Sequence, residues 1–230
     1  MSPRRIVEEA RKARLDLIAI CDHNAGENGQ YARKIAGETP VVLMGMEIQT
    51  MEEVEILALF EDEEACLSLQ KELYALLPPI PCDPELFGDQ LVVDENDEIV
   101  KRLDKLLLSP VPLPLEEVVR RVREREGLVI PAHVDRVSGG LLGVLGLLPA
   151  GDWPAVEISP WLEEMEALTR WPELRGRGIL RSSDAHYPEE IGRGWTELYA
   201  AAPNFSELVL AVHRRQGRRL RPGPAMKGGS

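Results

Sequence analysis

Short apolar runs alternate with helical patterns along most of the chain, and this alternation limits the fold more than any other feature of the sequence. We expect strands at residues 15–20, 41–48, 54–60, 128–132, 156–158, 179–181 and 196–200. Helices are expected from Ser2, around residues 63–76, from Leu115 to a stop at Gly127, and from Asn204. Strands that alternate with helices are typical of βα units and of a mostly parallel sheet. The sequence therefore predicts an α/β protein.

The chain of 230 residues is long enough to bury a substantial core, and we expect one domain over residues 1–220. Within it, residues 61–114 are predicted to form a helical and acidic excursion between strands, and residues 221–230 a flexible tail. No apolar run is long enough to cross a bilayer, and the start lacks the apolar core of a signal peptide. The three cysteines are widely spaced and do not suggest disulfides, so a cytoplasmic protein without a membrane partner is expected.

The formal net charge is −12, from 27 basic and 39 acidic side chains. Because long duplex nucleic acid is bound through a basic stripe, this charge argues against such a duplex as a partner. It does not exclude a phosphate substrate, since bound divalent cations can reverse the sign of a site. The basic residues between 214 and 221 are explained by the end of a helix and a solvated tail.

Three of the four histidines, His23, His133 and His186, follow apolar runs. The carboxyl ends of parallel strands are where α/β barrels and open sheets build their active sites. His186 ends the pentapeptide Ser-Ser-Asp-Ala-His, in which Asp184 comes two residues earlier. If this segment continues a strand, both side chains point to the same side, because strand side chains alternate. Imidazole nitrogen and carboxylate oxygen bind Zn, Mn and Fe, so the pattern predicts a shared metal site.

Several carboxylates also stand at the ends of predicted strands. Glu47 follows Met-Gly-Met, an apolar run in which a carboxylate is costly unless it is paired or bound to a metal. The other strand-end carboxylates are Asp22, Glu55 and Glu157. Each of these groups also has a simpler interpretation, as a hydrogen-bonded histidine or a solvated acid at a strand end. Cys21, beside Asp22, is better explained as a small strand-end residue than as a ligand.

Four short motifs follow one another along the chain: Cys21-Asp22-His23-Asn24, Gly45-Met46-Glu47, Pro131-Ala132-His133-Val134-Asp135-Arg136 and Ser182-Ser183-Asp184-Ala185-His186. In order and spacing they resemble the PHP (polymerase and histidinol phosphatase) family of metal-dependent phosphoesterases, over about residues 2–215. The resemblance implies a distorted (βα)7 barrel that holds two to three divalent metal ions, with Mn, Zn and Mg as the candidates. It also implies a small phosphorylated substrate or a short oligonucleotide.

The resemblance further implies roles for individual residues. The residues that match the family's metal ligands are His23, Glu47, His133, Asp184 and His186, with Glu47 in the position that bridges two ions. Asp22 is expected to orient His23 or to relay a proton. Arg136 resembles a clamp for the substrate phosphate, which suits its planar guanidinium, although an exposed loop arginine is the alternative. The residues expected to take part in catalysis are Asp22, His23, His133 and Asp184.

The chain departs from the family pattern in two places. The family opens with a strand that ends in His-x-His, and this chain has no histidine before His23, so the first strand is expected to be missing. Either a start site set too late or a reduced family member would explain this. Glu55 stands where the family usually carries a histidine ligand. It is a weak candidate ligand, and it would favour a harder ion such as Mn or Mg over Zn.

The leading hypothesis is metal-dependent hydrolysis of a phosphate ester. A catalytically reduced PHP-like module with a binding or structural role is the second hypothesis, because the ligands of the family's first motif are absent. A metal-dependent amidohydrolase is the third, since that superfamily also places His and Asp ligands at the strand ends of a barrel. The sequence leaves the oligomeric state open.

Overall fold

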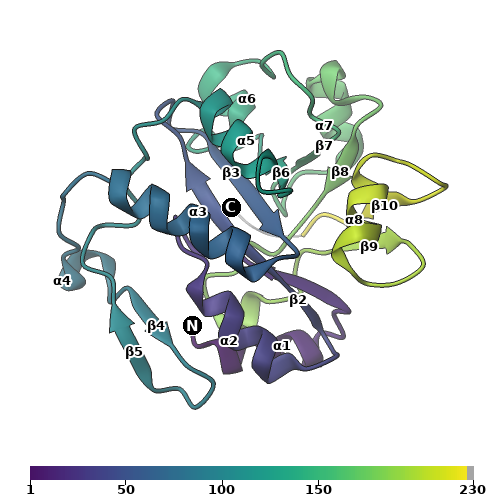
Figure 1. Cartoon of the computed structure of the whole chain (residues 1–230). Coiled ribbons are helices and arrows are strands. Elements are labelled where there is room, and N and C mark those ends of the chain that lie inside the picture. Colours follow the sequence, from purple (N-terminus) through teal and green to yellow (C-terminus); the bar gives the residue numbers. More distant parts are fainter. Residues whose placement is uncertain (227–230) are drawn as a thin grey trace. The chain divides into compact units, whose positions relative to one another are not determined.

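The computed structural model describes residues 1–226, and the chain divides into two compact units, Met1–Val129 and Ile130–Ser230. Helices and strands occur in both units, so the fold is mixed α/β as the alternation predicts (Figure 1). Among the described residues, no helix is long and apolar enough to cross a membrane. The single domain expected over residues 1–220 stays a prediction.

The helices of the first unit are α1 (Pro3–Lys12), α2 (Glu27–Ala36), α3 (Glu63–Leu76), α4 (Pro84–Phe87) and α5 (Leu115–Arg123). Its strands are β1 (Leu17–Ile20), β2 (Val41–Gln49), β3 (Glu55–Phe60), β4 (Leu91–Val93) and β5 (Ile99–Arg102), followed by β6 (Leu128–Pro131), in which the second unit begins. Strands β1, β2, β3 and β6 form one sheet in that order. The strands expected in this part of the chain are therefore confirmed, with ends that differ by one or two residues.

Strand β2 is the centre of the first unit because its residues from Val42 to Ile48 are all buried. A core cluster joins it to β1 and to helices α1 and α2; its buried members are Val7, Ile20, Ala32, Ala36 and Val42. Side chains alternate along a strand, so Val42 faces these helices and Glu47, five residues later, points to the opposite face. The candidate ligand Glu47 is therefore turned away from α1 and α2.

Strands β2 and β3 run antiparallel, which corrects the expectation of a mostly parallel sheet at this point. The connection between them covers only residues 50–54, and a parallel pair would need a crossover of a dozen or more residues. The turn is closed by the Thr50 amide, which donates to the Val54 carbonyl at 2.9 Å, and by Glu53, whose φ is +61°. Strands β1 and β2 do pair in parallel, as the βα pattern predicts.

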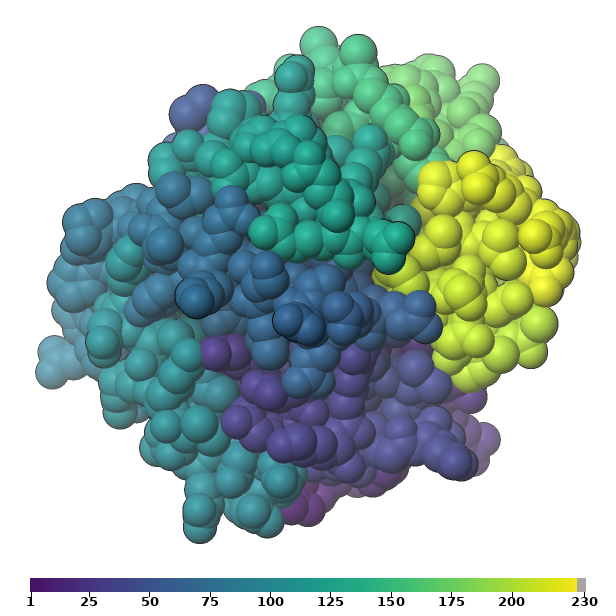
Figure 2. Space-filling model, viewed as in Figure 1, coloured from purple at the N-terminus to yellow at the C-terminus, as the bar shows by residue number. Residues whose placement is uncertain are grey.

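The predicted excursion, residues 61–114, contains α3, α4 and the antiparallel hairpin β4–β5. Helix α3 lies across β2 and β3, whereas the hairpin projects from the edge of the first unit (Figure 1). All four residues of β5 are exposed, and atoms of this segment form part of the molecular surface (Figure 2). Helix α4 and strand β5 are therefore peripheral, whereas α3 contacts β2 and β3.

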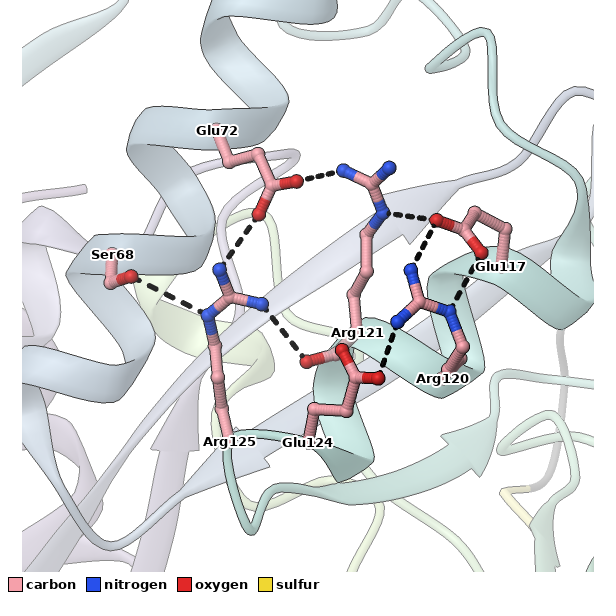
Figure 3. Close-up of polar contacts among 7 residues, drawn as sticks. All are labelled: Ser68, Glu72, Glu117, Arg120, Arg121, Glu124 and Arg125. Carbon is pink, nitrogen blue, oxygen red and sulfur yellow. Dashed lines mark hydrogen bonds and ion pairs between the residues drawn. The ribbon is translucent and has the colours of Figure 1, made fainter.

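Helices α3 and α5 are joined by a network of charged side chains (Figure 3). Glu72 of α3 accepts hydrogen bonds from Arg121 and from Arg125, the latter at 2.7 Å. Glu117 in turn accepts from Arg121 at 2.8 Å and from Arg120 at 2.9 Å. Because each carboxylate is shared between two guanidinium groups, the network ties the two helices together more firmly than isolated surface pairs would.

In the second unit, the helices are α6 (Leu141–Leu145), η1 (Pro172–Leu174) and η2 (Pro188–Glu190), with α7 (Glu164–Arg170) and α8 (Phe205–Val212). The strands are β7 (Ala155–Glu157), β8 (Gly178–Leu180), β9 (Thr196–Tyr199) and β10 (Arg219–Pro222). Strands β7 and β8 are parallel neighbours, and β9 pairs antiparallel with β10. The segment expected to be a flexible tail, 221–230, thus starts inside β10, and residues 227–230 lie outside the described part of the chain.

Candidate functional site

The first strand-end motif continues alongside β2 beyond the end of β1. The Asn24 amide donates to the Glu47 carbonyl at 2.8 Å, and the Glu47 amide donates to the Asp22 carbonyl at 3.2 Å. His23 and Glu47 thereby form a parallel bridge, which places their side chains on the same face. The His23 Nδ1 atom lies 3.5 Å from the Glu47 Oε2 atom.

Glu55 joins this pair because of the register between β2 and β3. Glu47 is opposite Leu57, and Gln49 is opposite Glu55, so the two glutamates are diagonal neighbours on one face of the sheet. One ligand atom each from His23, Glu47 and Glu55 lies within 4.8 Å of the other two. An ion about 2.1 Å from each of two ligands holds these no more than about 4.2 Å apart, so small side-chain rotations suffice for binding. The donor set of one imidazole and two carboxylates fits a divalent metal ion.

Asp22 has a polar neighbour that the sequence did not suggest. Its Oδ2 atom accepts a hydrogen bond from Asn28 Nδ2 at 2.9 Å, and Asn28 also bonds the backbone of Leu91 and Val93 in β4. Burial raises the pKa of the Asp22 carboxyl, and the Asn28 hydrogen bond opposes this shift. Asn28 therefore links the motif to the excursion. Sequence reasoning did not single it out; the only signal is its closeness in sequence to the Cys21–Asn24 motif.

Asn24 anchors the far end of the excursion to the same motif. Its side-chain amide donates to the carbonyls of Leu107 and Ser109, at 2.8 and 3.2 Å, and its backbone φ is +50°. Asparagine tolerates this left-handed conformation better than most residues do. The chain turns sharply here, directly after His23, and the residue that makes the turn is 1% exposed.

In the second unit, His133 lies just past the end of β6 and is buried. Its amide donates to the Glu157 Oε2 atom at 3.3 Å, and the next amide, of Val134, donates to the Glu157 carbonyl at 2.9 Å. Asp135 accepts from both the amide and the hydroxyl of Ser159, at 2.7 and 2.6 Å. The loops after β6 and β7 are thus joined at two points. Glu157, a weaker ligand candidate from the sequence, serves here to hold the His133 backbone.

The Ser-Ser-Asp-Ala-His segment is not strand, because β8 already ends at Leu180. Asp184 has φ +47°, so the alternation that would put Asp184 and His186 on the same side does not apply. The Asp184 Oδ2 atom instead lies 2.6 Å from Arg136 Nη2. His186 is exposed, and its Nδ1 atom lies 3.0 Å from the Asp184 carbonyl oxygen.

A carboxylate that sequence reasoning missed organises the segment after Asp184. The Glu190 Oε2 atom accepts the amides of His186 and Tyr187, at 2.9 and 3.1 Å, and these two bonds hold the Glu190 pKa below its usual value. The Ser183 hydroxyl donates to the Gly194 carbonyl and accepts the Gly192 amide, at 2.9 and 2.8 Å. The loop from 182 to 194 is therefore fixed by its own polar side chains.

The structure thus brings three of the predicted ligands together, whereas another predicted ligand is paired with an arginine. Three of them, His23, Glu47 and Glu55, form one group in the first unit. Within residues 1–226 no second group of three ligand side chains meets the same criterion. The ligands expected in the second unit are His133, Asp184 and His186, and there Asp184 pairs with Arg136, the predicted phosphate clamp.

Comparison with known proteins supports the resemblance inferred from the motifs. A model of the family described as PHP-associated matches residues 170–216. The lesion-specific endonuclease Q of Pyrococcus furiosus has a similar fold, with a TM-score of 0.68 at 16% identity over 94% of this chain and 52% of that chain. The fold of the chain is PHP-like.

Two other solved structures are similar to this PHP-like chain. A protein of Bacteroides vulgatus with a predicted PHP-like metal-dependent phosphoesterase domain gives a TM-score of 0.57 at 14% identity, over 98% of this chain and 60% of that one. A protein of Bifidobacterium adolescentis regarded as a metal-dependent phosphoesterase gives 0.56 at 18% identity, over 93% and 91%.

An endonuclease Q has also been solved with a 27-mer duplex that carries an abasic lesion at the active site, and it matches with a TM-score of 0.63 at 16% identity, over 94% and 52%. The chain spans about half the length of the endonuclease Q chains that it matches. Among curated protein sequences, none matches this chain significantly. At these identities the solved structures establish the fold of the PHP-like chain and leave its activity to be argued from its residues.

Proposed function

We propose that the chain is a metal-dependent phosphoesterase. The observation that carries this proposal is the group of His23, Glu47 and Glu55, whose ligand atoms converge within 4.8 Å on one face of the β2–β3 pair. The likeness to PHP-like phosphoesterase structures supports it independently. The finer form of the fold that we propose is the distorted (βα)7 barrel of that family.

His23, Glu47 and Glu55 would hold a divalent metal ion in the first unit. When bound, such an ion polarises a phosphoryl oxygen and lowers the pKa of a coordinated water. Two carboxylates and one imidazole make an oxygen-rich set, so we propose Mn or Mg in preference to Zn. Glu47 is 7% exposed, and a buried carboxylate of this kind favours a cation as its neighbour.

In the second unit we propose that Arg136 binds the substrate phosphate. Its guanidinium already forms a close ion pair with the Asp184 carboxylate, and the Arg136 side chain keeps 38% of its surface exposed. A phosphate oxygen can replace that carboxylate as acceptor, or accept from the same guanidinium beside it. Either way the charge-assisted hydrogen bonds are of the same kind. The roles proposed for His133, Asp184 and His186 as further ligands, and for Asp22 as a residue that orients His23, rest on the motif resemblance.

The substrate that we propose is a small phosphomonoester, a nucleotide or a short oligonucleotide. The net charge of −12 disfavours long duplexes, whereas a protein of similar fold has been solved with a 27-mer duplex. Both substrate classes therefore belong in the assay. An amide substrate belongs there too, because strand-end His and Asp ligands also fit an amidohydrolase.

One observation favours a second candidate, a catalytically reduced module that binds a metal or a phosphate without hydrolysis. Asp184, expected to be a metal ligand, is held by Arg136, and the ligand group in the first unit has three members. Three protein ligands are enough for a catalytic site, in which an open position takes water or substrate. We therefore keep the hydrolase as the first proposal.

The test combines metal content with hydrolysis. The protein would be stripped with EDTA and dialysed against Mn²⁺ or Zn²⁺, and the bound metal measured by elemental analysis. Hydrolysis of p-nitrophenyl phosphate, bis(p-nitrophenyl) phosphate, a short oligonucleotide, a duplex and a p-nitroanilide would then be followed. Glu47→Gln should lower both metal content and phosphoester hydrolysis, and Glu55→His should shift the preference from Mn²⁺ toward Zn²⁺.

His213→Ala is the matched control, because His213 lies at the end of α8, outside every candidate motif, and should leave the metal content unchanged. Unchanged metal binding in Glu47→Gln would refute the assignment of the site. Metal binding without hydrolysis of any substrate would favour the binding module.

A further inference from the structure

Two exposed aromatic side chains stand on the loops that follow β7 and β8. Trp161 is 46% exposed and Tyr187 is 63% exposed. Because β7 and β8 are parallel neighbours, both loops leave the sheet at the same edge. Two large aromatic rings exposed on neighbouring loops offer apolar surface that a ligand can cover.

Trp161 is exposed although its backbone is held on several sides. The Leu162 amide donates to the Ser159 carbonyl at 3.3 Å and closes a turn around the tryptophan. The carbonyl before the tryptophan, of Pro160, accepts the Met226 amide at 2.8 Å, and the carbonyl after it, of Leu162, accepts a hydrogen bond from the buried Arg181. The ring is therefore presented to solvent from a fixed support.

Tyr187 is presented in the same way. Its amide donates to the Glu190 carboxylate at 3.1 Å, and its carbonyl accepts the Glu190 amide at 3.0 Å. A rigid aromatic side chain loses little conformational entropy when a partner binds, since only two side-chain torsions remain free. Rigid exposed rings are what a stacking surface needs.

Arg136 is connected to both aromatic loops by short chains of contacts. It pairs with Asp184, three residues before Tyr187. Its neighbour Asp135 binds the amide and hydroxyl of Ser159, two residues before Trp161. A guanidinium with 38% of its side-chain surface exposed thus belongs to the same set of loops as the two rings.

We propose that Trp161 and Tyr187 form a stacking surface for an unpaired nucleobase whose phosphate is bound by Arg136. The combination favours a nucleotide, because a planar π-system and a phosphate are then recognised by the rings and the cation respectively. This inference rests on the proposed phosphoesterase function for its substrate phosphate, and it assigns to the same chain a preference for unstacked bases.

The test measures binding, so that it does not depend on turnover. Fluorescently labelled oligothymidylate and an abasic oligomer of equal length would be titrated by anisotropy, first in EDTA and then in Mn²⁺ with nonhydrolysable linkages. Base stacking contributes enough that Trp161→Ala and Tyr187→Ala should each weaken oligothymidylate binding by about 5- to 100-fold. Binding of the abasic oligomer should be unchanged in both variants, whereas Arg136→Ala should weaken binding of both oligomers.

Trp161→Phe and Tyr187→Phe should retain most of the affinity, since a phenyl ring still stacks. The matched control is Met165→Ala, which removes a side chain that is 72% exposed on α7 without removing a ring. Equal losses for both oligomers in the alanine variants, wild-type affinity in those variants, or no oligomer binding by the wild type in either condition would overturn the inference. So would a dimer that dissociates on Trp161→Ala, which would make the rings a protein interface.

The failure of the proposed function would look different. In that case oligomer binding would remain and would depend on the rings, while no phosphoester would be hydrolysed with any metal. Conversely, if only the stacking inference is wrong, hydrolysis of p-nitrophenyl phosphate would persist while the base makes no difference to binding.

Discussion

Gly143→Ala tests the geometry of the loop that carries His133 and Arg136. Gly143 lies inside α6 without a positive φ, so helix propensity alone predicts that alanine stabilises the protein by about 0.5–1 kcal/mol. The structure predicts the opposite sign. A Cβ atom at this position would stand 1.8 Å from the carbonyl oxygen of Arg136 and 2.6 Å from its carbonyl carbon.

The size of the effect follows from that distance. A carbon and a carbonyl oxygen normally approach to about 3.3 Å, so the backbone at Arg136 has to move by roughly 1.5 Å. Forcing an extra methyl group into packed structure typically costs about 1–3 kcal/mol, which exceeds the gain in helix propensity. We therefore expect a net loss of about 1–2 kcal/mol and a melting temperature lower by about 2–8 °C.

Thermal and urea unfolding followed by circular dichroism would measure this loss, with Gly29→Ala as the matched control. Gly29 is also inside a helix, and a Cβ there would meet the end of the flexible Met44 side chain, with the sulfur at 3.0 Å. Gly29→Ala should therefore be tolerated much better than Gly143→Ala. If Gly143→Ala proves as stable as the unaltered protein or more stable, the close approach of the loop to α6 is wrong.

Two further outcomes follow from side chains away from the candidate site. Burial raises the pKa of the Cys66 thiol to about 12, so at pH 8 Cys66 should stay protonated and resist Ellman's reagent. The half-buried Cys21 and Cys82 should react. Three reactive thiols in the native protein would contradict this. Glu72→Gln removes the carboxylate shared by two arginines, so it should lower the free energy of unfolding by about 1–2 kcal/mol at low salt and by less in 1 M NaCl. Glu61→Gln, an exposed change outside the network, should change it little. A salt-independent loss in Glu72→Gln would argue against an electrostatic role.

The strands β1, β2, β3, β6, β7 and β8 could be predicted from the sequence because each is a short apolar run between polar segments. The helix α2 could not, since Glu27–Ala36 begins after a glycine with no side-chain cap and carries few large apolar residues. The hairpin β4–β5 was missed for a related reason. Its strands are short and mostly exposed, so they leave no alternation of apolar and polar residues in the sequence.

The candidate site was predictable in its residue types and less so in its geometry. Glu55 is a weak ligand candidate in the sequence, yet it belongs to the group with His23 and Glu47, because the antiparallel register makes it a diagonal neighbour of Glu47. Register is a property of two strands together, and neither strand reveals it alone. Asp184 is the opposite case, since reasoning from strand alternation assumed an extended chain where the backbone turns.

Backbone conformation sets three of the motifs apart from the rest of the described chain. Nine residues other than glycine have a positive φ among the described residues, and six of them lie at helix ends or in hairpin turns, where such conformations are common. The other three are Asn24, His133 and Asp184.

Each of these three lies in a different strand-end motif, next to or within the set of predicted ligands. For histidine in particular the conformation is costly and persists only where the surrounding contacts impose it, as the Glu157 carboxylate and the packed glycines 140 and 143 do here. Strain of this kind is often retained where it positions a functional group, so Asn24, His133 and Asp184 mark positions at which the proposed roles of the neighbouring ligands should be tested first.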